Sequence, residues 1–383
     1  MKLFRATAAG MLFAAITLGV ADLAAAEEET PVPGRWPLEK ARAWYAKQPW
    51  LVGCNYIPAN AINQLEMWQA DTFDPEIIDK ELAWAEELGF NTLRVYLHDL
   101  VWGDDADGLY QRMDKFLDIC DQRGIRVLFV FFDDCHRPDP KLGKQPPPVR
   151  GFHNSGWAKC PATEVVIRYH EKTASPEEVA RLRGYVVETM RRFKDDPRVL
   201  AWELYNEPGR SAGERSVKLL RDAWKWAREA APSQPVCSTA EGSAGKEYVE
   251  IARANSDVIS FHCYDDSKLE EIIDFYEKTG RPALCTEYMA RPKSTFQRAL
   301  PILKKHNVAA INWGFVSGKT GTVWPWSSRN GKDVYQLREQ GVIVKPGEPF
   351  PEPKTWFHDI YRTDKTPYDP AEAELIRRLT GKK

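Results

Sequence analysis

Two glutamates follow short apolar runs that are far apart in the sequence. Glu207 comes directly after "VLAWELYN" (199–206), and Glu287 comes directly after "ALCT" (283–286). Short apolar runs rich in β-formers are typical of strands that are buried on both faces. Two carboxyl groups held about 5 Å apart can cleave a glycosidic bond, one donating a proton and the other attacking the anomeric carbon. That chemistry requires a fold that brings the two strand ends together.

Further polar and aromatic residues stand near the ends of other apolar runs. Arg94 lies in "TLRVYL", His262 and Tyr264 lie in "SFHCY", and Trp313 lies in "INWGF". A guanidinium is well suited to holding a carboxylate ionised by bidentate hydrogen bonds. Each residue also has a plain structural alternative, namely an ion pair, a core histidine or a packing aromatic. Their shared position at strand ends is hard to explain by packing alone.

The apolar runs alternate with segments that carry helix signals. Segment 175–193, for example, opens with a Ser N-cap, a Pro at the first helical position and acidic residues in the first turn. Eight strands alternating with helices predict an α/β fold of the (β/α)8 TIM barrel class. A doubly wound open sheet is the alternative, but no GxGxxG motif follows the first run. The expected strands are 50–56, 91–97, 126–132, 199–205, 235–240, 258–264, 283–288 and 309–315.

Three connections are longer than a bare barrel needs, and they follow strands 1, 3 and 8 at 57–75, 133–174 and 316–356. They leave the strand ends at which barrel enzymes keep their active sites. Aromatic rings stack on apolar sugar faces and amides supply directional hydrogen bonds, although the same residues can simply pack a loop onto a barrel. Bulky loops on three sides favour a pocket for short oligosaccharides or chain ends over an open cleft. The loop candidates for sugar contact are Trp68, Trp157 and Trp324, with Asn60, Gln64, His153 and Trp326 beside them.

The whole pattern resembles clan A of the retaining glycoside hydrolases, most closely the cellulase-like family 5 type. The resemblance extends from "GCNYIP" to "NWGFVSGKTGTVWPW" and therefore over nearly all of the chain after its first residues. It implies that Glu207 is the acid/base and Glu287 the nucleophile. It also implies sugar-binding or supporting roles. These fall to Arg94 beside the nucleophile, Asn206 at the sugar 2-hydroxyl, the strand-6 pair His262 and Tyr264, and Trp313 as the platform of the −1 subsite.

The third strand departs from the family pattern. Many family 5 enzymes end this strand with a histidine, whereas this chain reads "FVFFDDCH", which places Asp133 or Asp134 there. The departure bears on the substrate more than on the reaction. Glu203 lies earlier in strand 4 than Glu207, so we expect a buried structural pairing for it.

These features predict a retaining β-glycoside hydrolase that cleaves β-linked oligo- or polysaccharides, of glucan or mannan type. The substrate is the expected partner, and no metal or organic cofactor is required. One alternative is a non-catalytic carbohydrate-binding barrel, but such a module has no need to keep both glutamates together with Arg94 and Asn206. Another is a transglycosidase that uses the same pair of glutamates.

Composition and the N-terminal sequence limit the expected binding partners and the expected location of the protein. The chain has 383 residues and a formal net charge of −2. Its Lys and Arg residues are scattered, so the sequence has no basic stripe that would predict binding to nucleic acid. Residues 1–26 carry a basic start, an apolar stretch and a small-residue cleavage site, which predict a signal peptide and a periplasmic or secreted protein. Residues 27–383 are then expected to form a single catalytic domain without a membrane span. The oligomeric state stays open.

Seven cysteines are present, and none forms a CxxC pair or a zinc-like spacing with histidine. Most fall within apolar runs, where Cys behaves as a small buried hydrophobe. Cys135 and Cys160 lie in one long loop, and a disulfide between them is an open alternative.

Overall fold

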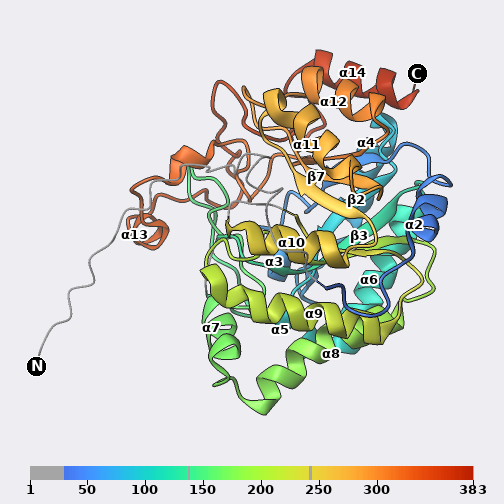
Figure 1. Cartoon of the computed structure of the whole chain (residues 1–383). Helices are drawn as coiled ribbons and strands as arrows, with labels where there is room; N and C mark the ends of the chain where they lie inside the picture. Colours follow the sequence, from blue (N-terminus) through green and yellow to red (C-terminus); the bar gives the residue numbers. More distant parts are fainter. Residues whose placement is uncertain (1–29, 137–138, 241–243, 383) are drawn as a thin grey trace, which may run out of the picture.

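The computed structural model describes residues 30–136, 139–240 and 244–382, so the predicted signal peptide lies outside the described residues. Eight parallel strands form one sheet in the order β5-β4-β3-β2-β1-β8-β7-β6. A parallel bridge between Thr239 and Ser260 links the two ends of this order, so the sheet closes into a (β/α)8 barrel (Figure 1). The predicted fold class is confirmed. The strands are β1 (Val52–Asn55), β2 (Thr92–Tyr96), β3 (Arg126–Asp133), β4 (Val199–Asn206), β5 (Val236–Cys237), β6 (Ile259–His262), β7 (Ala283–Glu287) and β8 (Ala309–Trp313).

Helices surround the barrel, as Figure 1 shows. Helix α8 packs against α9, and the C-terminal helix α14 packs against α12 and α4. The helices are α2 (Leu38–Tyr45), α3 (Gln64–Trp68), α4 (Pro75–Leu88), α5 (Asp99–Asp104), α6 (Ala106–Asp121), α7 (Thr163–Glu171), α8 (Pro176–Arg192), α9 (Ser216–Ala230), α10 (Lys246–Asn255), α11 (Leu269–Glu277), α12 (Phe296–Lys305), α13 (Val334–Glu339) and α14 (Pro370–Thr380).

Local sequence signals account for the helix ends. Ser175 and Glu178 form the capping box that opens α8, as its sequence predicts. Asp74 accepts a hydrogen bond from the amide of Ile77 at the start of α4, and Gly89 ends that helix with φ +78°. A glycine adopts this left-handed conformation without a Cβ penalty.

The side chains of each strand alternate between two cores. On β3, Leu128 and Val130 lie in the cluster that fills the barrel. Phe129 and Phe131 lie in the cluster between the strands and the surrounding helices. Because successive strand residues point to opposite faces, a continuous apolar run fills both cores. The strands therefore form a rigid frame whose C-terminal ends can hold polar groups in fixed positions.

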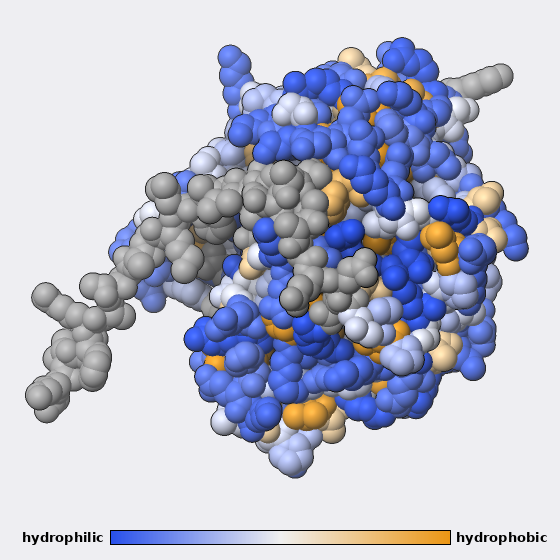
Figure 2. Space-filling model, in the orientation of Figure 1, coloured by the Kyte–Doolittle hydropathy of each residue, from blue (hydrophilic) through white to orange (hydrophobic). Residues whose placement is uncertain are grey.

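The connections at these C-terminal ends differ greatly in length. Those after β1, β3 and β8 are long, as predicted, while α9 to α12 begin within about ten residues of the ends of β4 to β7. The face in Figure 2 is largely hydrophilic with scattered apolar residues, and Leu142 and Tyr335 are the exposed large hydrophobics of the described chain. Within the described ranges, no helix is both long and apolar enough to span a lipid bilayer.

Candidate active site

The barrel brings the two glutamates together. Glu207 follows β4 and Glu287 ends β7, and their side chains are only 11% and 6% exposed. One carboxylate oxygen of each glutamate and one ring nitrogen of His262 all lie within 4.8 Å of one another. Because β4 and β7 are not neighbours in the sheet, closure of the barrel is what produces this proximity.

Arg94 on β2 lies at the centre of the site and is completely buried. Its guanidinium donates hydrogen bonds to Oε1 of Glu287 at 2.7 Å and to Oδ1 of Asn206 at 2.7 Å. It also donates to Oδ1 of Asn55 at 2.8 Å. The cation therefore orients the carboxylate of Glu287 and the amide of Asn206, because its donors have fixed directions.

Glu203 on β4 is the buried structural partner that the sequence predicts. It accepts two hydrogen bonds from Arg94, at 2.5 and 3.1 Å. The hydroxyls of Thr239 and Ser260 donate to the same carboxylate at 2.6 and 3.1 Å. Every oxygen of Glu203 is thus satisfied inside the barrel, below the level of Glu207.

Removing this partner is expected to destabilise the fold strongly. We expect Glu203→Ala to lower the free energy of unfolding by about 3–5 kcal/mol, because it removes the acceptor of four buried hydrogen bonds, two of them from the charged Arg94. Glu229→Ala is the matched control, since that glutamate pairs with arginines at the surface and is 38% exposed, and its loss should cost under about 0.5 kcal/mol. Urea unfolding of both variants measures the difference, and equal midpoints would contradict the role of Glu203.

Glu207 stands in an environment that favours its charged form. His262 Nδ1 lies 2.9 Å from one carboxylate oxygen, and the thiol of Cys135 donates to the other at 3.2 Å. Nε of Arg210 lies 3.3 Å from the same second oxygen. Burial raises the pKa of Glu207, but the charge of Arg210 and the contact with His262 outweigh burial and hold the pKa well below its ordinary value. The residue also has φ +42°, a left-handed conformation that is uncommon outside glycine.

His262 on β6 lies between the two glutamates. Its Nε2 is 3.5 Å from Oε1 of Glu287, while its Nδ1 faces Glu207. Burial lowers the pKa of His262, but the charges of Glu287 and Glu207 outweigh burial and raise the pKa above its ordinary value. The two carboxylates on either side of His262 therefore favour its charged form, and the ring bridges them.

Two tyrosines complete the surroundings of Glu287. Tyr264, which the family resemblance assigns to the site with His262, donates its hydroxyl to Oε2 at 2.7 Å. Tyr96 donates to Oε1 at 3.1 Å, and the sequence analysis missed it. The signal was available, because Tyr96 stands two residues after Arg94 on the same strand and so shares its face. Asn55, Cys135 and Arg210 were also missed.

The end of β3 takes the place of the family histidine, and the two aspartates have separate roles. Asp133 accepts from Asn206 Nδ2 at 2.9 Å and from Trp157 Nε1 at 2.7 Å. Burial raises the pKa of Asp133 to about 7. Asp134 points away and accepts from the amide of Gly209 at 2.7 Å, which anchors the turn after Glu207. Asp133 is thus the one that joins the site.

The tryptophans predicted to stack on sugars lie in different surroundings, some beside the site and one inside the protein. Trp313 and Trp157 pack edge to face with ring centres 5.4 Å apart and both lie beside Tyr96. Trp68 is completely buried between Phe73 and Phe116 and donates to the carbonyl of Tyr96. Its ring leaves no face for a sugar, so this prediction is wrong, and the packing alternative applies.

Trp324 also serves loop packing. Its Nε1 donates to the carbonyl of Pro351 at 3.1 Å, and its own carbonyl lies 2.7 Å from Nδ1 of His153. Its neighbour Trp326 is the one that meets the site, with its ring edge to face on Tyr264 at 5.0 Å. Neighbouring residues in a loop point in different directions, which the sequence does not reveal.

The disulfide alternative is not realised. All seven cysteines are free thiols. Cys135 donates to Glu207, while Cys160 contacts Asp99, with its sulfur 3.3 Å from the Asp99 amide nitrogen. The two thiols therefore serve different carboxylates on either side of β3.

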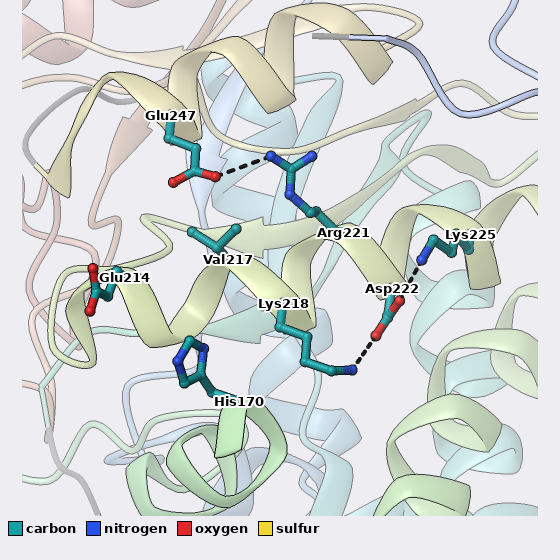
Figure 3. A pocket seen from close by; sticks show the side chains of 8 residues that line it. All are labelled: His170, Glu214, Val217, Lys218, Arg221, Asp222, Lys225 and Glu247. Atoms are coloured by element: carbon teal, nitrogen blue, oxygen red, sulfur yellow. Dashed lines mark hydrogen bonds and ion pairs between the residues drawn. The ribbon is translucent and has the colours of Figure 1, made fainter. Parts of the chain in front are cut away.

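Glu207, His262 and Glu287 have ligand atoms close enough to hold a metal ion. Arg94 lies directly against Glu287, however, and a fixed cation there disfavours a second one. A separate hollow of about 500 Å³ lies on the outer surface at α7, α9 and α10 (Figure 3). Within it Asp222 pairs with Lys218 and Lys225, and Arg221 pairs with Glu247.

Comparisons with known proteins support a glycoside hydrolase of the TIM-barrel type. Residues 108–313 match the family model described as "Glycosyl hydrolases family 2, TIM barrel domain". No curated protein matches the sequence.

Similar solved structures share the fold at low sequence identity. One is the endo-beta-1,4-mannanase from Thermotoga petrophila, with 14% identity, a TM-score of 0.53 and coverage of 88% of this chain and 77% of that one. Another is a glycoside hydrolase family 5 mannosidase from Rhizomucor miehei, with 15% identity, a TM-score of 0.55 and coverage of 88% and 94%. A third is GH5_18 from Streptomyces cattleya in complex with GlcNAc, with 14% identity, a TM-score of 0.55 and coverage of 87% and 81%.

Proposed function

This chain belongs to the family described as "Glycosyl hydrolases family 2, TIM barrel domain", and we propose that it is a glycoside hydrolase that cleaves β-glycosides with retention of configuration. The observation that carries the proposal is a short distance: one carboxylate oxygen of Glu207 lies within 4.8 Å of one carboxylate oxygen of Glu287. Retaining enzymes hold their two carboxyl groups about 5–5.5 Å apart, whereas inverting enzymes leave about 6.5–9.5 Å for a water molecule.

Glu287 is the nucleophile in this proposal. Arg94, Tyr96 and Tyr264 all donate hydrogen bonds to its carboxylate, which supports an ionised group with a fixed direction of attack. One oxygen attacks the anomeric carbon while the bond to the leaving oxygen breaks. The product of this step is a covalent glycosyl-enzyme.

Glu207 is the acid and then the base. The first step needs a proton on Glu207, and His262 Nδ1, 2.9 Å away, is placed to supply it. As Glu287 bonds to the sugar it loses its charge, and the pKa of His262 falls because one of the two charges that raise it is gone. The proton passes through Glu207 to the leaving oxygen, and ionised Glu207 afterwards deprotonates the water that releases the sugar.

The substrate class that we propose is a β-mannan or β-glucan type oligosaccharide. The mannanase and mannosidase activities named for two structural neighbours support this choice, although at 14–15% identity their likeness extends to the fold alone. Assignment to the family 5 type and export by way of residues 1–26 are proposals that rest on sequence patterns. A transglycosidase with the same glutamates is the alternative, and a non-catalytic barrel is disfavoured by the intact contacts of Arg94 with Glu287 and Asn206.

The test is the anomeric form of the first product. Wild-type protein is incubated with aryl β-mannosides and β-glucosides, and the first sugar released is followed by proton NMR before mutarotation. We expect the β-anomer. An α-anomer would show inversion and remove the nucleophile role from Glu287, while transfer products in the presence of added acceptor sugars would favour the transglycosidase.

A further inference from the structure

The positions of the two glutamates set the direction of a bound chain. The leaving oxygen must lie beside the acid, Glu207, so the departing part of the substrate lies over the end of β4. The sugar under attack lies over Glu287 on β7 and Trp313 on β8. Any sugar further toward the non-reducing end must then continue away from β4, over the ends of β8 and β1.

The long connection after β8 closes onto the connection after β1. The amide of Lys319 donates to the carbonyl of Ala59 at 2.9 Å, and its ammonium reaches Glu66 at 2.5 Å. A Cβ added at Gly318 would lie only 2.3 Å from that same carbonyl oxygen. The two backbones therefore meet with no space for a ligand between them at this point.

The connection after β1 also binds the one after β3. Asn63 donates to the carbonyl of Gly156 at 2.9 Å and to the side chain of Gln145 at 2.8 Å. Gln64 donates to the carbonyl of Ala158 at 3.0 Å. Asn63 is 2% exposed and Gln64 is 1% exposed, so these amides bind the neighbouring loop and face away from solvent.

The connections after β3 and β8 close the circle. Arg338 donates to the carbonyl of Ser155 at 2.8 Å, and the amide of Asn154 donates to the carbonyl of Thr320 at 2.8 Å. An antiparallel bridge joins Val149 and Ile343. The three connections thus form one hydrogen-bonded wall, which we call the three-loop wall and define as segments 57–69, 139–160 and 316–344.

The space between the site and this wall is small. A cavity of about 20 Å³ lies between Trp313 and Tyr96 on the site side and Trp157 and Thr320 on the wall side. A cavity of this size holds about one water molecule. On the opposite side, by contrast, α9 begins at Ser216, soon after Glu207, so the leaving side has only a short connection.

We infer that the active site is a pocket with one sugar subsite on the non-reducing side, closed by the three-loop wall, so that the enzyme removes single sugars from non-reducing chain ends. This inference rests on the proposed function, because it needs Glu207 as acid and Glu287 as nucleophile. The leaving side, by contrast, carries only the short connection between β4 and α9.

The experiment compares nitrophenyl β-monosides with nitrophenyl β-1,4-biosides of mannose and glucose. We expect immediate release of nitrophenol from the monoside of the preferred sugar. From its bioside we expect release after a lag, because the terminal sugar must leave first. Oligosaccharides labelled at the reducing end should shorten by one sugar at a time, and blocking the non-reducing end should abolish their hydrolysis.

The outcomes separate this inference from the proposed function. Immediate release from the bioside, or hydrolysis of the blocked oligosaccharide, would overturn the single subsite while leaving the retaining hydrolase intact. Failure to cleave any of these β-glycosides would overturn both.

A pair of lysine variants tests the wall itself. Lys319→Ala removes the ion pair with Glu66 and is expected to raise direct cleavage of the bioside relative to the monoside. Lys365→Ala removes a similar pair with Glu87 on the outer surface, at 2.7 Å, and should leave the ratio unchanged. The same ratio in both variants would contradict a role for the Lys319–Glu66 ion pair in holding the wall closed.

Discussion

Replacing Glu287 by Gln is expected to reduce kcat on every β-glycoside by on the order of 10⁴-fold or more. The amide has nearly the same shape as the carboxylate but cannot form the glycosyl-enzyme. The loss should be the same for good and poor leaving groups, because no leaving group can compensate for an absent nucleophile. Initial rates with dinitrophenyl and methyl β-glycosides measure the effect.

The fold of the Glu287→Gln variant should stay intact. Arg94 loses one charged partner but keeps the two hydrogen bonds to Glu203, so no buried charge is left without a counter-charge. Glu214→Gln is the matched control, since Glu214 lies exposed in the turn after β4. We expect wild-type rates from the control and similar circular dichroism spectra from both variants. Near-normal turnover by Glu287→Gln would remove the nucleophile assignment.

Replacing Glu207 by Ala is expected to have a large effect that depends on the leaving group. Natural β-linked sugars need a proton on the departing oxygen, so their hydrolysis should fall by about 10²–10⁴-fold. A dinitrophenolate leaves without protonation, so the first step should survive with that substrate. The glycosyl-enzyme should then accumulate, because no base activates water for the second step, and a burst of dinitrophenol followed by slow turnover should be seen.

Azide distinguishes a missing base from a damaged site. It is a small anion that needs no deprotonation, and the alanine leaves space beside Arg210 and His262, which contact Glu207 in the wild type. We expect azide to restore turnover of the dinitrophenyl substrate and to yield the β-glycosyl azide. An α-azide, or an absence of any burst, would contradict the assignment of Glu207.

The pH profile gives a second reading of the same variant. The proton that His262 and Glu207 share must be present for the first step, so wild-type activity on poor leaving groups should fall as pH rises through the raised pKa of His262. In Glu207→Ala that alkaline decline should disappear for the dinitrophenyl substrate, because its first step needs no proton.

Much of the fold follows from local patterns. Each strand is an apolar run whose residues fill the barrel on one face and contact helices on the other, as Leu128 and Phe129 do. Caps such as Ser175 and Asp74 mark where helices begin. Because parallel strands joined by helices must align, polar residues that end different runs were expected to meet, and Arg94, Glu207 and Glu287 do so.

Loops behaved differently from strands. Trp68 lies in a connection on the active face, yet it turns inward between two phenylalanines. Trp326 meets Tyr264, while Trp324 packs within the loops. Cys135 contacts Glu207 and makes no disulfide. A loop has no regular residue period, so the sequence does not show which way a loop side chain points. Its contacts depend on the other loops that pack against it.

The sequence by itself determined the barrel, the strand ends at which Glu207 and Glu287 stand and the buried pairing of Glu203, because a strand's period and end constrain where each side chain points. Only the tertiary structure decided the distance between Glu207 and Glu287, the place of His262 between them and the choice of Asp133 over Asp134. It also decided that three long loops bind one another into a wall. These features depend on contacts between residues far apart in the chain, and such contacts exist only once the barrel has closed.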